Sequence, residues 1–170
     1  MMFTGKTVLI TGGAQGIGKA IAERFSNLNA KIYIFDLKNL ENIDSDRNIH
    51  YIQGDVSQNN DVTDFVNHVM NLDGQIDIVV NNAGIIRDAA IWNMAEADFD
   101  AVINVNLKGP WLICRAVAPI MRKQKSGRII NIASRSWLGN FGQSNYSSSK
   151  GGLVSLTRVL ALELAKSNVT

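Results

Sequence analysis

Short apolar segments alternate with longer segments of helical periodicity along the whole sequence. After the first apolar segment, for example, Ile17, Ile21 and Phe25 recur at four-residue spacing, which is typical of one helix face. Strands separated by helices need crossover connections, and they form a parallel sheet with helices on both faces. The sequence therefore predicts an α/β protein, a three-layer α/β/α sandwich with a doubly wound parallel sheet. The predicted strands span residues 7–10, 31–36, 49–52, 76–80 and 128–132, and the predicted helices span 17–28, 57–72, 98–123 and 145–166.

Local signals set the ends of several elements. Ser57 has the side chain of a helix N-cap and is predicted to cap the second helix. Pro110 and Pro119 are predicted to kink or bound the third helix, because proline lacks a backbone N–H. Residues 39–48 are polar and irregular, and they are predicted to form a loop or a short helix.

Composition narrows the possible functions. The length of 170 residues suits one domain, and a formal net charge of +2 is too small to attract nucleic acid unless the charges cluster. No apolar run reaches the ~18 residues of a membrane span, and the start of the chain does not resemble a signal peptide. One cysteine, Cys114, suits a reducing compartment. We expect a cytoplasmic protein with no nucleic-acid or membrane partner. His50 and His68 lack metal-ligand spacing, so no metal site is predicted.

The segment TGGAQGIG at 11–18 carries the first chemical signal. It follows a predicted strand and opens a predicted helix, the setting in which glycines let the backbone approach a pyrophosphate at a helix N-terminus. Asp36, at the end of the second strand, is placed to bind the hydroxyls of an adenosine ribose. The pattern predicts a Rossmann-type dinucleotide site, and the alternative is a tight glycine turn without a ligand. The predicted cofactor-binding residues of this part are Gly12, Gln15, Gly16, Ile17, Gly18 and Asp36.

Tyr146 and Lys150 carry the second signal. Residues four apart lie one turn apart on the same helix face, where the ammonium would stabilise a phenolate and make it usable as an acid or base. Ser134, twelve residues upstream, could hold a substrate oxygen beside Tyr146. Taken alone, a Tyr–Lys pair at this spacing could also be part of a solvated helix face.

Together these segments resemble the short-chain dehydrogenase/reductase family. TGGAQGIG at 11–18 matches the TGxxxGxG loop of that family, NNAG at 81–84 its motif after the fourth strand, and YSSSK at 146–150 its YxxxK. Asp55 and Val56 match its adenine-contacting pair, and Asn106 in VNLKG matches its helical asparagine. Among the branches, the chain is similar to the single-domain enzymes typified by 3-oxoacyl-acyl-carrier-protein reductase.

The resemblance implies a role for each matching residue. Tyr146 would be the general acid/base and would also contact the cofactor, Lys150 would bind the nicotinamide ribose, and Ser134 would orient the substrate oxygen. Asn106 would hold a water in a proton relay, and Asn82, Ala83 and Gly84 would line the cofactor cleft. Ser136 lies two residues from Ser134 and could compete for the serine role.

The resemblance also implies that part of the family's fold is missing. Residues 168–170 look like the start of a sixth strand, whereas members of the family carry two more strands and a substrate lid. Residues 1–170 are therefore expected to form a single dinucleotide-binding domain, truncated after the fifth strand and following helix.

Two functions remain open at this level. The first is an NAD(P)-dependent oxidoreductase that interconverts a secondary alcohol and a ketone, with a 3-hydroxyacyl/3-oxoacyl thioester as one option. The second is a non-catalytic dinucleotide-binding module or an inactive fragment. The presence of Asn106, Ser134, Tyr146 and Lys150 together favours the enzyme.

Gln15 and Asp36 favour NAD over NADP. Related reductases that use NADPH carry an arginine where this chain has the neutral Gln15, and the Asp36 carboxylate would repel a 2′-phosphate. Lys38 could turn toward such a phosphate, so NADP stays the less favoured alternative.

The long helices suggest an oligomer. The resemblance implies a homotetramer in which the helices over 98–123 and 145–166 pair across a two-fold axis. A stripe of apolar residues on the last helix fits this arrangement but could equally pack on the chain's own sheet. The stripe consists of Leu153, Leu156, Val159, Leu160 and Leu164.

Overall fold

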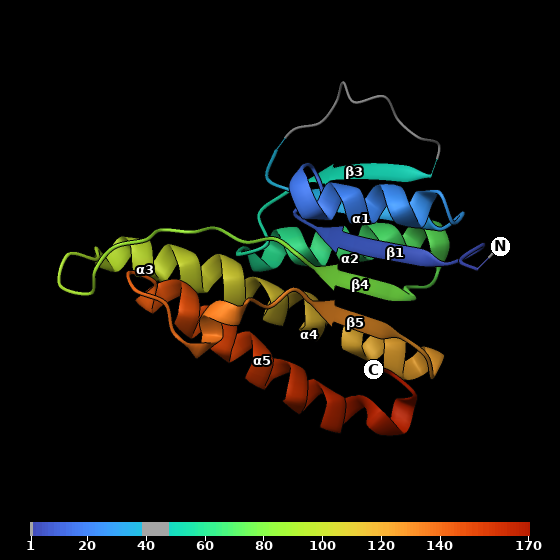
Figure 1. Cartoon of the computed structure of the whole chain (residues 1–170). Coiled ribbons are helices and arrows are strands. Elements are labelled where there is room, and N and C mark those ends of the chain that lie inside the picture. The colour runs from blue at the N-terminus through green and yellow to red at the C-terminus, as the bar shows by residue number, and fades with distance from the viewer. Residues whose placement is uncertain (1, 39–47) are drawn as a thin grey trace.

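Five parallel strands form one sheet in the computed structural model, which describes residues 2–38 and 48–170 (Figure 1). The spatial order is β3-β2-β1-β4-β5, and every neighbouring pair is parallel. This order places the second and fourth strands on either side of the first, which confirms the doubly wound α/β fold. The strands are β1 (Thr7–Thr11), β2 (Lys31–Asp36), β3 (Ile49–Gln53), β4 (Ile78–Asn81) and β5 (Arg128–Asn131).

Helices cover both faces of the sheet and give the predicted three layers. Successive side chains of a strand point to opposite faces, so Val8 and Ile10 pack toward α1 (Gly16–Ser26), whereas Leu9 packs on the other face. That second face carries α2 (Asn59–Asp73), α4 (Gly109–Gln124) and α5 (Ser144–Leu164). The central strands β1, β2 and β4 are nearly continuous in apolar residues because both of their faces are buried, whereas β5 at the edge is partly exposed.

Two stacked rings join β2 to α2. The ring centroids of Phe35 and Phe65 are 4.6 Å apart with an interplanar angle of 7°, and both side chains are about 1% exposed. Phe35 immediately precedes Asp36 at the carboxyl end of β2. The stack therefore holds the strand end from which Asp36 projects.

The predicted cap of the second helix is wrong. The helix α2 begins at Asn59 with Gln58 as its N-cap and no side-chain capping bond. Ser57 instead belongs to a turn, because its N–H donates to Asp55 Oδ1 at 2.8 Å, and the Asp55 N–H donates to Asp61 Oδ2 at 2.9 Å. Ser57 is therefore part of the turn that precedes α2 and does not cap the helix.

The third predicted helix is divided into three parts. A helix α3 (Glu96–Ile103) is followed by a π-helical turn, η1 (Asn104–Lys108), and then by α4. Pro110 lies in the first turn of α4, as expected of a boundary proline, whereas Pro119 lies inside α4 and does not end it. The π-helical turn had no signal in the sequence, and such turns often occur at functional sites.

The end of the chain lies against β5. Two short 3₁₀ segments flank α5: η2 (Arg135–Leu138) precedes it and η3 (Ala165–Ser167) follows it. After η3, Val169 forms a parallel bridge with Gly127, and the Ile129 N–H donates to Thr170 O at 2.8 Å. The expected start of a sixth strand is therefore found beside β5. The prediction for residues 39–48 lies almost entirely outside the described residues.

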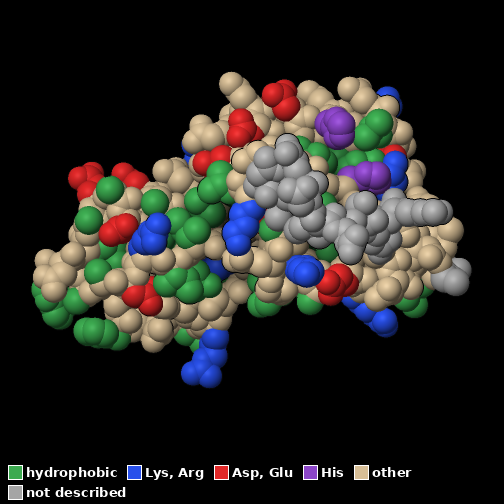
Figure 2. All heavy atoms as spheres, turned by 90° about the horizontal axis from the view of Figure 1, so that it is seen from above, with side chains coloured by type: hydrophobic (Ala, Val, Ile, Leu, Met, Phe, Trp, Pro, Cys, Tyr) green, Lys and Arg blue, Asp and Glu red, His purple; other side chains and the backbone are tan. Residues whose placement is uncertain are grey.

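The surface mixes charged and apolar side chains. Figure 2 shows Lys, Arg, Asp and Glu scattered over one face, with hydrophobic side chains at the end where α3 lies in Figure 1. Exposed apolar residues include Trp92, shortly before α3, and Phe141, shortly before α5, which are 75% and 83% exposed. Within the described ranges, no helix combines the length and apolar character that crossing a bilayer requires.

Replacing Phe65 with alanine tests the aromatic stack. We expect Phe65→Ala to lower the free energy of unfolding by about 3–5 kcal/mol, because it removes a fully buried ring and leaves a cavity against Phe35. The exposed Phe141 offers a matched control, and Phe141→Ala should change stability by less than about 0.5 kcal/mol. Urea unfolding measures both values, and equal losses in the two variants would contradict the proposed importance of the stack.

Candidate functional site

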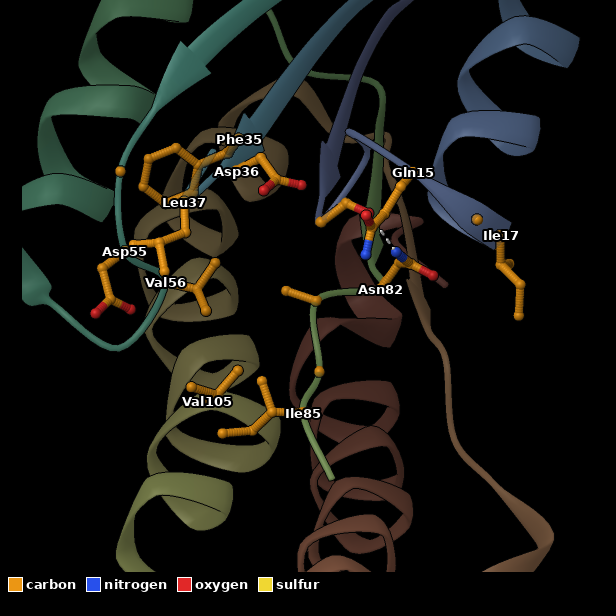
Figure 3. A pocket seen from close by; sticks show the side chains of 15 residues that line it. Gln15, Ile17, Phe35, Asp36, Leu37, Asp55, Val56, Asn82, Ile85 and Val105 are labelled. Carbon is orange, nitrogen blue, oxygen red and sulfur yellow. Dashed lines mark hydrogen bonds between the residues drawn. The ribbon is translucent and has the colours of Figure 1, made fainter. Parts of the chain in front are cut away.

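A cavity of about 360 Å³ opens at the carboxyl ends of the strands (Figure 3). Its walls come from the segments that follow β1, β2, β3 and β4, around the point where the strand order reverses. This crevice is where open α/β sheets bind ligands. Ten of the predicted cofactor-binding residues line it: Gly12, Gln15, Gly16, Ile17, Asp36, Asp55, Val56, Asn82, Ala83 and Gly84.

The glycine loop is held closely against the segment after β4. Gly12 has φ +67°, and a β-carbon on it would lie 2.7 Å from Ala83 Cα, so only glycine fits there. Asn82 Nδ2 donates to Gly12 O at 2.8 Å, the bond drawn as a dashed line in Figure 3. Gly18 does not line the cavity, but a β-carbon on it would collide with the carbonyl oxygen of Gly12. Both glycines therefore permit the tight turn.

Thr11 ties the same two segments together, and sequence reasoning missed it as part of the site. Its Oγ1 accepts the N–H groups of Asn82 and Ala83, each at 3.1 Å. The only sequence signal was its place as the first letter of the TGGAQGIG segment. Thr11 thus fixes where the loops after β1 and β4 meet.

The start of α1 can receive an anion. Gln15 is the N-cap residue and makes no side-chain capping bond, and the first turn holds no acidic residue. The first N–H groups of a helix lack intrahelical partners and carry the positive end of the helix dipole. The edge of the cavity at Gly16 therefore suits a phosphate group.

Asp36 is oriented by backbone groups on both sides. Its Oδ2 accepts the Ala14 N–H at 3.0 Å, and its Oδ1 accepts the Lys38 N–H at 3.1 Å. Each carboxylate oxygen can accept a further hydrogen bond, so the side chain can still bind ligand hydroxyls. The Lys38 ammonium donates to Gln15 Oε1 and so lies at the same end of the cavity.

Several cavity walls are apolar and were not predicted. Phe35 and Leu37 flank Asp36 in the sequence, and Val105 comes from the π-helical turn. The position of Phe35 and Leu37 beside Asp36 was an available signal, whereas Val105 depends on how η1 packs. The cavity walls that sequence reasoning missed are Phe35, Leu37, Gly54, Ile85 and Val105.

Tyr146 and Lys150 lie together on α5 at the end of β5. The Lys150 ammonium lies 5.6 Å from the centroid of the Tyr146 ring and donates to Ile132 O at 2.7 Å. Lys150 is only 5% exposed. Burial lowers the pKa of the Lys150 ammonium, since loss of hydration disfavours the charged form.

Ser134 follows Ile132 by two residues and caps η2, which packs on α5. Its Oγ accepts the Ser136 N–H at 3.2 Å and pairs with the Ser136 hydroxyl at 2.9 Å. Ser134 and Ser136, the two candidates for the serine that orients the substrate oxygen, therefore form a hydrogen-bonded pair.

Asn106 connects the cavity to α5. This buried side chain accepts the Ile85 N–H at 2.8 Å and donates to Ile85 O at 3.0 Å. Its amide also donates to Ser149 Oγ at 3.4 Å, one residue before Lys150. Because Ile85 lines the cavity, Asn106 spans from the cavity wall to the helix that carries Tyr146.

Other reactive side chains do not form a second centre in the described parts of the chain. Cys114 is buried, and burial raises the pKa of its thiol to about 12, which leaves it protonated. Across residues 2–38 and 48–170, no three His, Cys, Asp or Glu side chains group so that they could hold a metal ion.

Known proteins match this chain along most of its length. The family model for short chain dehydrogenases matches residues 6–170. The chain is 43% identical to the hydroxy(phenyl)methylsuccinyl-CoA dehydrogenase subunit BbsD of Thauera aromatica, over 97% of this chain and 69% of that protein. It is 41% identical to the 3-oxoacyl-(acyl-carrier-protein) reductase FabG of Thermotoga maritima, over 99% of this chain and 72% of the relative. A 3-oxoacyl-(acyl-carrier-protein) reductase of Synechocystis is 38% identical, over 98% and 71%. The chain belongs to the short-chain dehydrogenase family and is an oxidoreductase acting on CH–OH groups.

Proposed function

We propose that this protein binds NAD(H) in the cavity and interconverts a secondary alcohol and a ketone at Tyr146, and that residues 1–170 act as one dinucleotide-binding domain. The supporting observation is the continuous chain of contacts from Ile85 through Asn106 and Ser149 to the Tyr146–Lys150 helix. A 3-hydroxyacyl/3-oxoacyl thioester is the proposed substrate, because two relatives are named as 3-oxoacyl reductases and one as a dehydrogenase of a CoA thioester.

The residues around the cavity fit a nicotinamide dinucleotide. The glycine loop and the start of α1 would hold the pyrophosphate, and Asp36 would bind the adenosine ribose. Asp55 and Val56 would contact the adenine, and Asn82 to Gly84 would line the path toward α5. When bound, the nicotinamide supplies or accepts a hydride.

Tyr146 would move the proton of the reaction. During alcohol oxidation its phenolate oxygen would accept the hydroxyl proton, and during ketone reduction its O–H would donate that proton back. The Lys150 ammonium beside the ring stabilises the negative charge on that oxygen. Ser134 would donate a hydrogen bond to the substrate oxygen and hold it near Tyr146.

Lys150 has capacity for two further bonds. An ammonium group donates up to three hydrogen bonds, and one of these goes to Ile132 O. The other two are available for the hydroxyls of the nicotinamide ribose and for a relay water. The two hydrogens of the Asn106 side-chain amide already donate to Ile85 O and Ser149 Oγ. A relay water held by Asn106 would therefore have to donate to its side-chain or backbone carbonyl oxygen.

The adenosine end of the cavity favours NAD. The Asp36 carboxylate is held in place by two backbone N–H groups and would oppose a 2′-phosphate. The contact of Lys38 with Gln15 favours NADP, since it brings a cation to the same end. We give the Asp36 carboxylate more weight than the Lys38 ammonium in this choice of cofactor, because Asp36 lines the cavity directly.

We also propose a homotetramer that pairs the long helices of neighbouring copies. A groove of about 530 Å³ lies between α4 and α5, with Trp111, Arg115 and Val159 on its walls. The predicted stripe on α5 divides between two environments: Leu153 and Leu164 are buried within the chain, whereas Val159 is 48% exposed. The exposed part is available to a second copy.

A non-catalytic dinucleotide-binding module is the alternative function. It shares the cavity but predicts no turnover, so a hydride-transfer assay together with dinucleotide titration separates the two. Binding without turnover across varied alcohols and ketones would favour the module.

Tyr146→Phe tests the proton-transfer role. We expect kcat to fall about 10²–10⁴-fold with the Kd for NADH unchanged, because the ring stays while the hydroxyl is lost. Lys150→Ala should reduce both kcat and NADH affinity. Absorbance of NADH with acetoacetyl-CoA gives the rate, and tryptophan fluorescence gives the Kd. Near-full turnover in Tyr146→Phe would refute the assignment.

Asp36→Ala combined with Gln15→Arg tests the preference for NAD. The wild-type protein should bind NADH more tightly than NADPH, and the double variant should shift this ratio toward NADPH, because a like charge is removed and a cation is added. Asp64→Ala, at an exposed position on α2, is the matched control. A wild-type kcat/KM that is higher with NADPH would overturn the proposal.

Val159→Lys tests the tetramer. A lysine in the groove would place charge in an apolar helix interface, so the mass measured by light scattering should fall from that of a tetramer. Leu72→Lys, at a 58% exposed position on α2, should leave the mass unchanged. A wild-type protein that is monomeric would contradict this proposal.

A further inference from the structure

Ser134 and Ser136 form a hydroxyl pair in the loop after β5. Ser134 Oγ lies 3.2 Å from the Ser136 backbone nitrogen and 2.9 Å from the Ser136 Oγ. From this geometry, and resting on the proposed function, we infer that Ser136 is a positioning residue that holds the Ser134 hydroxyl as a hydrogen-bond donor to the substrate oxygen.

The hydrogen-bonding capacity of serine limits what each hydroxyl of the pair can do. A serine hydroxyl has one donor hydrogen and two acceptor lone pairs. The Ser136 N–H fills one acceptor position of Ser134. In the arrangement that we infer, the Ser136 O–H, whose oxygen lies 2.9 Å away, fills the other. The Ser134 hydroxyl can then only donate. A ketone oxygen and an alkoxide oxygen are both acceptors, so this polarity suits the substrate in either direction of the reaction.

The pair also strengthens the bond that Ser134 would donate. Hydrogen bonds in a chain polarise one another, so the bond from the Ser136 hydroxyl makes the Ser134 O–H a better donor. In this arrangement the Ser136 proton lies between the two hydroxyls, and Ser134 is the serine that donates to the substrate.

The short turn η2 keeps the pair together. The Trp137 N–H donates to Ser134 O at 3.2 Å, and the Gly139 N–H donates to Ser136 O at 2.9 Å. Both serines are partly buried where η2 packs on α5. Ser136 is thus held by the backbone in reach of Ser134 before any substrate binds.

A double-mutant cycle tests the inference. With acetoacetyl-CoA and NADH, Ser136→Ala should lower kcat about 3- to 10-fold, the effect of losing one typical hydrogen bond. Its Kd for NADH and its thermal midpoint should equal those of the wild type. Ser136→Thr keeps a hydroxyl and should recover most of the rate. In the Ser134→Ala background, Ser136→Ala should have no further effect, because Ser136 acts through Ser134.

The outcomes distinguish this inference from the function on which it rests. Ser148→Ala, at an exposed position on α5, is the control and should match the wild type. An active wild type with an unchanged Ser136→Ala rate would overturn the inference alone, and so would equal losses from Ser136→Ala with and without Ser134. A wild type that binds NADH but shows no turnover would overturn the proposed function and this inference together.

Discussion

The meeting of the β1 and β4 loops through Thr11 and Asn82 is the contact on which the site depends. The Thr11 hydroxyl accepts two backbone N–H groups from the β4 side, and the Asn82 amide returns a bond to Gly12 O. These bonds bring the backbones so close that glycine is required at position 12. These bonds hold the loops after β1 and β4 together at the bottom of the cavity, at the point where the strand order reverses. The start of α1 and Asp36 lie around this junction.

The rest of the site is joined to that floor by one buried side chain. The Asn106 side chain forms hydrogen bonds with the backbone N–H and the backbone C=O of Ile85, and it donates a third hydrogen bond to Ser149 on α5. A buried polar group is costly unless its bonds are made, so this amide specifies a single arrangement of the β4 loop, η1 and α5. The cavity wall at Ile85 is thereby joined by hydrogen bonds to the helix that carries Tyr146 and Lys150.

The sequence predicted what local patterns encode. Strand positions follow from apolar runs, and the glycine loop with Asp36 follows from their spacing, so the fold and most cavity residues were found. Features set by tertiary contacts were missed: the π-helical turn and the apolar walls at Val105 and Ile85. The turn that places Ser57 before α2 is local, but the serine was interpreted as a cap because its bond to Asp55 was not considered. The hydroxyl pair at Ser134 was visible only as two nearby serines, because its direction depends on the geometry of η2.

The π-helical turn has a consequence for the phase of the helices on either side of it. Successive residues of an α-helix are rotated by about 100° about the helix axis. If the wider π-helical turn accommodates one extra residue, the side chains of the following helix are rotated by that angle about the axis, compared with an unbroken α-helix. This offset lets α3 face α5 while the buried stripe of α4, which includes Leu112, Ile113 and Val117, faces the sheet and α2. Deleting a single residue within 104–108 would therefore act as a rotation of α4 about its own axis, turning its polar side toward the core.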